Sequence, residues 1–245
     1  MEEVKSVKIT TIVDNDVWRK KLMSSWGLSL FVETISEEKR YNVLMDTSGS
    51  FETLFKNASW LGVNFSSIKA IFVSHWHGDH CGSLSHVLPL SQRPIPVYVP
   101  SERPSKIRTI KDAQGTPIVC SRPTEFTAGL MSTGEMPFGI SEHSLLVNSK
   151  NKGLVVLVGC SHPGIINILK CAQEVSGVNK IFAVIGGFHI SSFTEGIAVG
   201  KFLREIDVEL VSPCHCTSID AKHGIAKIMG ERYIKNGSGK IISFD

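Results

Sequence analysis

The sequence has little net charge of either sign, no long apolar run and no apolar segment near its N-terminus. It contains 26 Lys and Arg residues against 23 Asp and Glu residues, a net charge of +3 at pH 7 with neutral histidine. A surplus this small does not indicate a nucleic-acid-binding or membrane-surface protein. The longest apolar run, Gly153 to Gly159, is much shorter than the roughly 20 residues that cross a bilayer. We therefore expect neither a nucleic-acid partner nor a membrane-spanning segment.

The first residues and the cysteines together indicate a cellular compartment. Met1 to Ser6 includes two acidic residues and lacks the apolar core of a secretory signal. Without such a signal, the six cysteines are expected to be reduced thiols and not a disulfide framework. The sequence thus predicts a cytoplasmic protein, and it leaves open whether the chain forms homo-oligomers.

Hydrophobic periodicity over the 245 residues predicts one α/β domain with two series of strands and helices. Strands are expected over 7–13, 28–34, 41–46, 68–74, 144–148, 154–159, 181–186, 208–212 and 240–244. Helices are expected over 51–61, 165–175, 195–206 and 221–229. Two sheets with helices on their outer faces fit this order. Residues 88–140 hold eight of the ten prolines and are expected to form an irregular cap or insertion, with short strand candidates at 97–99 and 118–120.

A dense group of metal-binding residue types follows the apolar strand expected over 68–74. In His75-Trp76-His77-Gly78-Asp79-His80, three imidazoles and a carboxylate fall within six residues. His75 and His77 point the same way on an extended backbone, and Gly78 lets Asp79 and His80 turn toward a second position. The alternative is that these are hydrogen-bonded loop residues grouped by chance. Because only nine of the 245 residues are histidines, three of them in one six-residue window are poorly explained by chance. Imidazole and carboxylate suit Zn, Fe or Mn.

Further ligands are expected at the ends of other strands, because one loop cannot close two metal sites. His162, His189 and His215 each follow an apolar strand beside a tight turn. By contrast, His86, His143 and His223 lack such a setting and are interpreted as ordinary surface or structural residues. Pro163 fits the first turn of the helix after His162, which would place free N–H groups near the metals and favour an anionic substrate.

These residues resemble the metallo-β-lactamase fold superfamily, whose motifs match Leu44–Thr47 and His75–His80. They also resemble one branch, the 7,8-dihydropterin-6-methyl-4-(β-ribofuranosyl)aminobenzene 5′-phosphate synthase-like proteins. The blocks of that branch match residues 27–29, 133–135, 159–162, 186–189 and 213–217. One departure from the branch is that Trp26 stands where a histidine commonly precedes Gly-Leu-Ser. Gly159-Cys160, which the branch shares, stands where many superfamily hydrolases have a Gly-Asp pair whose carboxylate bridges two metals.

The resemblance implies an αββα sandwich of two ββα halves with a mono- or dinuclear site for divalent transition metals, Zn first and Mn or Fe as alternatives. His75, His77 and His162 would hold one metal, and Asp79, His80 and His215 the other. Asp46 would orient the ligand loop. We interpret Cys160 as a buried structural residue, with a bridging thiolate as the alternative. Asp79 and His189 are the candidate catalytic residues.

Three functions compete. The leading one is a metal-dependent enzyme, of metallo-hydrolase type, that acts on a phosphorylated or otherwise anionic small molecule. The second is a transferase that condenses dihydropterin methyl pyrophosphate with a ribofuranosyl-aminobenzene phosphate in methanopterin-type cofactor synthesis. The third is a non-catalytic, zinc-stabilised binding protein, although structural zinc sites favour closed sets of four Cys and His ligands.

Overall fold

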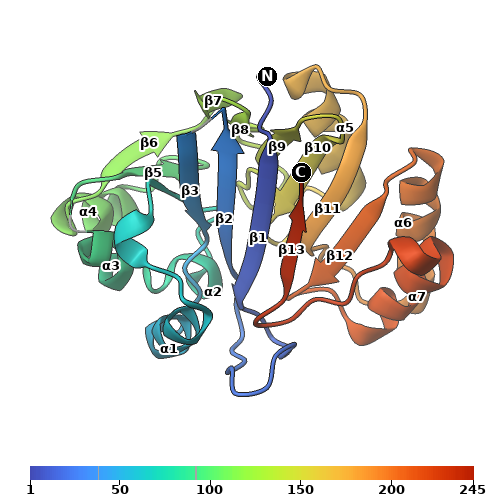
Figure 1. Ribbon diagram of the computed structural model, residues 1–245, viewed down its shortest axis with the longest axis horizontal. Coiled ribbons are helices and arrows are strands. Elements are labelled where there is room, and N and C mark those ends of the chain that lie inside the picture. Colours follow the sequence, from blue (N-terminus) through green and yellow to red (C-terminus); the bar gives the residue numbers. More distant parts are fainter. Residues whose placement is uncertain (38, 92) are drawn as a thin grey trace.

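The structure is a computed structural model that describes residues 1–37, 39–91 and 93–245. Two sheets pack face to face, and helices cover the outer face of each (Figure 1). The first sheet has the order β13-β1-β2-β3-β4-β5-β6, formed by β1 (Ser6–Val13), β2 (Ser29–Ser36), β3 (Lys39–Met45), β4 (Ala70–Phe72), β5 (Pro96–Val99), β6 (Thr116–Val119) and β13 (Ile241–Phe244). The second has the order β12-β11-β10-β9-β8-β7, formed by β7 (Thr124–Thr127), β8 (Leu130–Ser132), β9 (Leu145–Ser149), β10 (Gly153–Val158), β11 (Ile181–Gly187) and β12 (Leu210–Cys214).

The helices divide between the two outer faces. Those beside the first sheet are α1 (Phe51–Leu61), α2 (Gly78–Cys81), α3 (Leu84–Val87) and α4 (Pro104–Asp112), with 3₁₀ turns at Phe65–Ser67 and Leu88–Ser91. Those beside the second are α5 (Ile165–Ser176), α6 (Phe193–Glu205) and α7 (Ile219–Met229), with a 3₁₀ turn at Gly230–Arg232. In Figure 1 the two groups lie at the left and right sides. Among the described residues, no helix has both the length and the apolar character that crossing a membrane requires.

Local sequence explains where the main helices begin and end. At the start of α1, the Ser50 hydroxyl accepts a hydrogen bond from the Thr53 N–H, and Gly62 ends the helix in the left-handed conformation. A capping box formed by Ser192 and Glu195 begins α6. Each helix is therefore fixed at a defined distance from the strand that precedes it.

The shared core lies between the two sheets. Leu30 and Val43 from the first sheet and Val155, Leu157 and Ile185 from the second belong to one buried cluster. Burying large aliphatic side chains stabilises a fold by about 1.5–3 kcal/mol each, so this layer holds the sheets together. The arrangement is the αββα sandwich that the sequence predicts.

The segment 88–140 differs from the predicted cap. Its strands β5 and β6 extend the first sheet, and β7 and β8 begin the second. Its prolines lie where the hydrogen-bonding ladder tolerates them: Pro117 is in β6, the edge strand, and Pro104 is in the first turn of α4. Weak periodicity here reflects short strands and not an insertion. Gln92 of this segment, and Glu38 of the turn predicted between the second and third strands, lie outside the described residues.

Parallel pairing brings several strand ends to one edge. β3 and β4 run parallel in the first sheet, and β10, β11 and β12 run parallel in the second. The segments that leave the carboxyl ends of these strands therefore meet at the same side of the sandwich, together with the loop that follows β1. Ligands of open α/β sheets bind outside the carboxyl ends of the strands. The single-domain organisation remains a prediction.

Candidate metal centre

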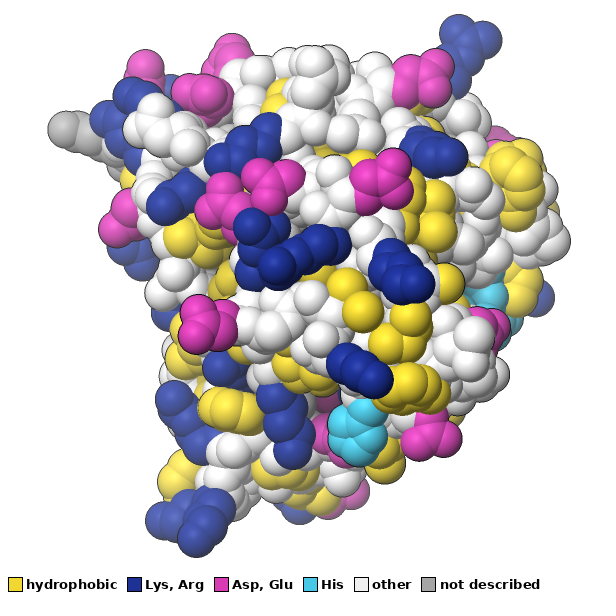
Figure 2. Space-filling model, turned by 90° about the vertical axis from the view of Figure 1, so that its right-hand side faces the viewer, with side chains coloured by type: hydrophobic (Ala, Val, Ile, Leu, Met, Phe, Trp, Pro, Cys, Tyr) yellow, Lys and Arg dark blue, Asp and Glu magenta, His cyan; other side chains and the backbone are white. Residues whose placement is uncertain are grey.

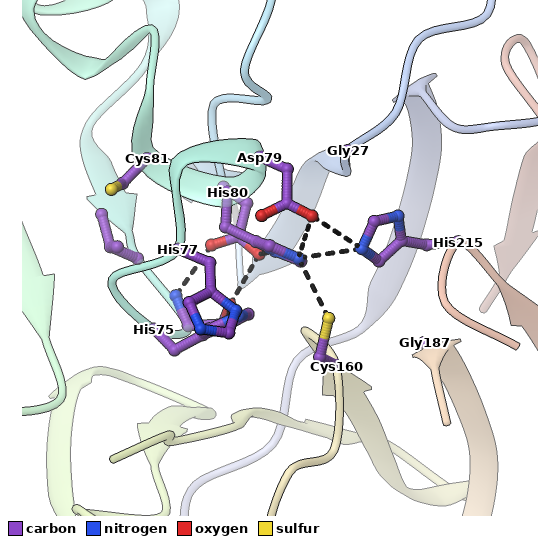
Figure 3. Close-up of polar contacts among 12 residues, drawn as sticks. Gly27, His75, His77, Asp79, His80, Cys81, Cys160, Gly187 and His215 are labelled. Atoms are coloured by element: carbon purple, nitrogen blue, oxygen red, sulfur yellow. Dashed lines mark hydrogen bonds and ion pairs between the residues drawn. The ribbon is translucent and has the colours of Figure 1, made fainter. Parts of the chain in front are cut away.

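The loop that follows β4 carries the histidine-rich motif. His75 and His80 are buried, whereas His77 and Asp79 are partly exposed. The Nε2 atom of His75 lies 3.1 Å from Nδ1 of His77. His80 lies in the short helix α2, and its Nε2 faces Cys160 and His215 of the second sheet (Figure 3). Its ring centroid lies 4.2 Å from that of His75, so the loop presents two adjoining pairs of ligand residues, His75 with His77 and Asp79 with His80.

Two histidines from the second sheet complete these pairs. His162 follows β10 and joins His75 and His77, and His215 follows β12 and joins Asp79 and His80. Within each group the potential ligand atoms all lie within 4.8 Å of one another. The structure therefore brings together the residues of the two triads that the resemblance implies.

Asp46 orients the histidines of the first loop. Its Oδ1 accepts a hydrogen bond from the Ser74 N–H at 2.7 Å, and its Oδ2 accepts from the Ser74 hydroxyl at 2.7 Å and from Nδ1 of His80 at 2.6 Å. Because the Ser74 hydroxyl donates to Asp46, it accepts from Nδ1 of His75 at 3.0 Å. One buried carboxylate consequently fixes the tautomer of both neutral imidazoles, in which Nδ1 carries the proton and Nε2 is free to bind a cation.

His215 is held by two residues that follow β1. Its backbone N–H donates to Oδ1 of Asp14 at 2.8 Å, and its ring Nδ1 donates to Oδ1 of Asn15 at 3.1 Å. The Gly27 N–H also donates to Oδ1 of Asn15, which identifies that atom as the amide oxygen. His215 therefore also has a bare Nε2, and it lies 3.1 Å from Nε2 of His80.

Glu142 holds the segment that carries His162. Its Oε1 accepts from the N–H groups of Cys160 and Ser161, each at 2.9 Å, and its Oε2 accepts from the His162 N–H at 2.8 Å. Burial raises the pKa of this carboxyl, and the three backbone donors oppose that effect. Each ligand segment is thus anchored by its own buried acid: Asp46, Glu142 or Asp14.

Cys160 and His189 lie against the two triads. The Cys160 sulfur is 3.2 Å from Nε2 of His80 and forms further close groups with His75, with His162 and His189, and with His215 and Cys216. It is buried, as expected, but its thiol faces the ligands and does not pack into the apolar core (Figure 3). His189 is exposed, and its ring centroid lies 4.6 Å from that of His162.

The residues fit a bound cation for a chemical reason. When both rings are neutral, Nε2 of His80 and Nε2 of His215 face each other as two lone pairs, because the one proton of each ring is committed to Asp46 or Asn15. Nε2 of His162 is buried with no hydrogen-bond partner among the described residues. Unpaired buried acceptors are costly, and a cation would satisfy all three.

Electrostatics favour neutral imidazoles at most of the site. Burial and the neighbouring imidazoles lower the pKa of His162 to about 4 and also lower the pKa of His75. The adjacent His215 imidazole is the main cause that lowers the pKa of Asp79, and His80 adds to the effect. At His80, burial lowers the pKa but the Asp46 carboxylate more than offsets it, so a cation must displace a proton there.

Backbone strain concentrates at the same residues. Asp46, Ser161, His189 and His215 all adopt positive φ angles, between 49° and 62°, although none is glycine. This conformation is uncommon outside glycine, and strained residues gather at functional sites. Four of the ten non-glycine residues with positive φ among the described residues thus lie in one cluster, which supports a functional role for it.

The structure separates the remaining histidines from the centre, as expected. His143 is buried and donates from Nε2 to the Val73 carbonyl, and His86 stacks on Phe51. Pro163 differs from the expectation: α5 begins at Ile165 with Gly164 as its N-cap, so Pro163 precedes the helix. A positive φ of 87° at Gly164 sets the boundary there.

Sequence reasoning missed Asp14, Asn15 and Glu142. The first two belong to Asp14-Asn15-Asp16, a polar triplet at the end of an apolar strand, the same signal that identified the histidines. Glu142 has no comparable signal, because it lies in a segment without regular structure between β8 and β9.

Comparisons with known proteins agree with this geometry. Residues 29–115 match the profile of the metallo-beta-lactamase superfamily. The 7,8-dihydropterin-6-methyl-4-(beta-D-ribofuranosyl)-aminobenzene-5′-phosphate synthase of Methanocaldococcus jannaschii is 26% identical, over 99% of this chain and 98% of that protein. An uncharacterised protein of the same organism is 23% identical over 96% of this chain and 99% of that protein.

Solved structures share the architecture. Tm1679, described as a metal-dependent hydrolase of the beta-lactamase superfamily, matches with a TM-score of 0.78 at 26% identity, over 96% of this chain and 98% of that one. YhfI from Bacillus subtilis, a metallo-beta-lactamase fold protein, matches with a TM-score of 0.70 at 13% identity, over 98% and 100%; it shows the fold alone. The resemblance and the fold predicted from the motifs are confirmed.

Proposed function

We propose that this chain, which has the fold of the metallo-β-lactamase superfamily, is a metal-dependent enzyme that acts on a small phosphorylated or otherwise anionic molecule. The observation that carries the proposal is the meeting of two ligand triads whose bare imidazole nitrogens face one another. Nε2 of His162 is also buried without a hydrogen-bond partner among the described residues, which a set of ordinary hydrogen-bonded loop residues would not leave.

The proposed ligands divide as the triads do. His75, His77 and His162 would hold one divalent transition metal, and Asp79, His80 and His215 the other. Zinc suits this donor set best, with Mn or Fe as alternatives. Bound there, the metals would supply Lewis-acid activation of the substrate oxygen and of water.

The side chains around the metals would supply orientation and proton transfer. His189 is exposed beside His162, where its ring can donate a hydrogen bond to negative charge that develops on the substrate. Asp79 is partly exposed, and its carboxylate lies 3.4 Å from Nε2 of His215, so it can hold a metal and accept a hydrogen bond that orients the attacking water. We therefore assign catalytic roles to Asp79 and His189.

The transferase alternative rests on one relative. The Methanocaldococcus jannaschii protein that aligns along nearly the whole chain is named as a synthase of 7,8-dihydropterin-6-methyl-4-(beta-D-ribofuranosyl)-aminobenzene-5′-phosphate. We keep as the second candidate the corresponding condensation in methanopterin-type cofactor synthesis. The same ligands would serve both reactions, so the substrate decides between them.

The open setting of the centre argues against a purely structural zinc site. Two cavities adjoin the ligands, one of about 400 Å³ beside His77 and one of about 540 Å³ beside His189 and His215. Structural zinc sites are closed by four protein ligands, whereas catalytic sites keep an open position. A non-catalytic, zinc-stabilised binding protein would have no need of this access.

We propose a small molecule and not nucleic acid as the partner, and a cytoplasmic location. Basic and acidic side chains lie side by side on the face that carries α6 and α7 (Figure 2). This face therefore lacks the uniformly positive electrostatic potential that attracts nucleic acid. All six cysteines are free thiols, which suits a reducing compartment.

The test combines metal analysis with an activity screen. We expect one to two transition-metal equivalents in the purified protein, and activity of the metal-loaded protein on a panel of phosphodiesters, lactones, thioesters and the pterin condensation. His77→Ala should abolish that activity and leave the fold intact, whereas His223→Ala, an exposed position on α7, should leave it unchanged. A protein that contains no metal and takes up none on reconstitution would contradict the proposal.

A further inference from the structure

An exposed indole stands beside the candidate metal centre. Trp26 is 67% exposed, and its ring centroid lies 5.4 Å from that of His215. An indole that stays in water does not stabilise the fold, because burial of apolar surface is what stabilises it. An aromatic face in that place is suited to contact a ligand.

Contacts with the ligand loop fix the backbone next to this indole. The Gly27 N–H donates to Asn15, and the Leu28 N–H donates to the Asp79 carbonyl at 3.2 Å. Gly27 has a φ of 138°, and a Cβ there would lie 2.5 Å from the Asp79 carbonyl oxygen, so only glycine permits this approach. Trp26 is therefore held in place by the same segments that hold Asp79 and His215.

The indole lines a cavity of a size that suits part of a small molecule. This cavity, of about 540 Å³, reaches from Trp26 and the exposed Ile219 to His189, His215 and Cys216. Ligand pockets commonly measure about 300–1,000 Å³, with mostly apolar walls and a few polar groups. Here the polar groups include the ion pair of Lys222 with Asp16. One wall can pack on a ring while the opposite end meets the metal centre.

The second cavity beside the centre does not offer the same surface. It includes Trp76, but that indole is only 7% exposed and donates its N–H to the Ser101 carbonyl at 3.2 Å. Its ring belongs to the core beneath α3 and α4. Of the two cavities, only the one beside His215 presents an accessible aromatic face.

We propose that the cavity beside Trp26 binds a planar ring of the substrate, packed on the indole, while the anionic group of the same molecule reaches the metal centre. The inference rests on the proposed function, since it supposes an anionic substrate at the metals. Trp26 is then a residue that determines specificity for ring-bearing substrates over aliphatic ones of the same size.

Three phosphonates test the proposal, because their phosphorus–carbon bonds resist hydrolysis: phenylphosphonate, cyclohexylphosphonate and methylphosphonate. Calorimetric titration of the metal-loaded protein should show phenylphosphonate binding roughly three- to tenfold more tightly than cyclohexylphosphonate, the range expected for an aromatic pair. Trp26→Ala should remove this preference and leave methylphosphonate binding unchanged. Trp26→Phe should retain part of it. Trp60→Ala is the matched control, because that indole is 66% exposed but lies on α1, and it should behave as wild type.

The outcomes separate this inference from the proposed function. If all three phosphonates bind equally, or if Trp26→Ala keeps the preference for the phenyl ring, the ring site is wrong while the metal proposal stands. If metal is taken up but no phosphonate binds, the ring site and the anionic substrate are both wrong. If the protein takes up no metal, the proposed function fails, and the inference fails with it.

Discussion

The Nδ1–H of His80 donates a hydrogen bond of 2.6 Å to Oδ2 of Asp46, and both side chains are fully buried. Because a carboxylate only accepts, this contact dictates which ring nitrogen of His80 carries the proton. The other nitrogen, Nε2, faces His215 and Cys160. A single buried acid thus decides whether the second triad is ready to bind a cation.

Asp46→Asn should weaken metal binding by about ten- to hundredfold, the usual effect of losing a partner that orients a ligand. The amide keeps only one acceptor oxygen, so either Ser74 or His80 loses its partner, and His80 can then place its proton on Nε2, inside the triad. Competition with a chelator of known affinity measures the change. Asparagine tolerates the φ of 58° at this position, so backbone strain does not confuse the result.

The control for this substitution is Asp112→Asn, at an exposed position near the end of α4. It removes the same charge from the chain without touching the centre. Equal metal affinities for wild type and Asp46→Asn would show that the His80 tautomer does not control binding.

Glu142→Gln should loosen the segment that carries Cys160 and His162. A glutamine has one acceptor oxygen where the glutamate uses two, so at least one of the three backbone N–H groups loses its partner. Leaving a buried donor unsatisfied costs about 1–3 kcal/mol. We expect that loss in urea unfolding of the metal-free protein, together with weaker metal binding. Glu174→Gln, on the outer helix α5, should change neither quantity.

Much of the fold follows from sequence because its strands are apolar and long enough to show their period. β10 and β11 are almost wholly buried, and they appear in the sequence as continuous apolar runs. In the segment 88–140, the short apolar runs at 97–99 and 118–120 indicate β5 and β6, whereas β7 and β8 were missed, because these strands have only three or four residues each. Their partners in the sheets come from strands elsewhere in the chain, which a local pattern does not contain.

The residues of the candidate site also differ in whether the sequence reveals them. His75, His77, Asp79 and His80 are visible because they are adjacent, and His162 and His215 because each follows a buried strand. Glu142 was missed because its role exists only in three dimensions: it accepts from N–H groups that lie 18 to 20 residues further along the chain. Every residue except proline has a backbone N–H, so residue types do not reveal which of these groups Glu142 binds.

Cys160 is buried, as the structural interpretation of this residue predicts, and its sulfur also lies where the alternative, a bridging thiolate, would place it. We propose the ligand role as the one to test. Cys160→Ser should therefore lower the bound metal toward one equivalent, because the thiol faces atoms of both triads. Loading with Co²⁺ provides a second measurement: wild type should show sulfur-to-cobalt charge-transfer absorption in the near ultraviolet, and the variant should lose it.

The matched control is Cys171→Ser, a partly buried thiol on α5 that takes part in none of the close ligand groups. It should keep both the metal content and the absorption of wild type. Full metal content in Cys160→Ser, with no charge-transfer absorption in wild type, would restore the structural interpretation of Cys160.

His143 should make the fold sensitive to acid. Burial lowers the pKa of His143 to about 3, against 6.5 for an unperturbed histidine. Its partners suit a neutral ring, since Nε2 donates to the Val73 carbonyl at 2.9 Å and Nδ1 can accept from the Ser132 hydroxyl at 2.8 Å. Below pH 6.5 the unfolded chain binds a proton that the native state excludes, so stability falls as the pH falls toward 3.

At pH 5.5 this single group should reduce the free energy of unfolding by about 1.4 kcal/mol relative to pH 8. His143→Gln keeps a donor and an acceptor but cannot titrate, so it should be less stable at pH 8 yet lose about 1.4 kcal/mol less between the two pH values. Urea unfolding of both proteins, with a chelator present so that the other imidazoles titrate alike, gives the comparison. Parallel losses of stability in the two proteins would mean that His143 is protonated without unfolding the chain, and that burial does not hold its ring neutral.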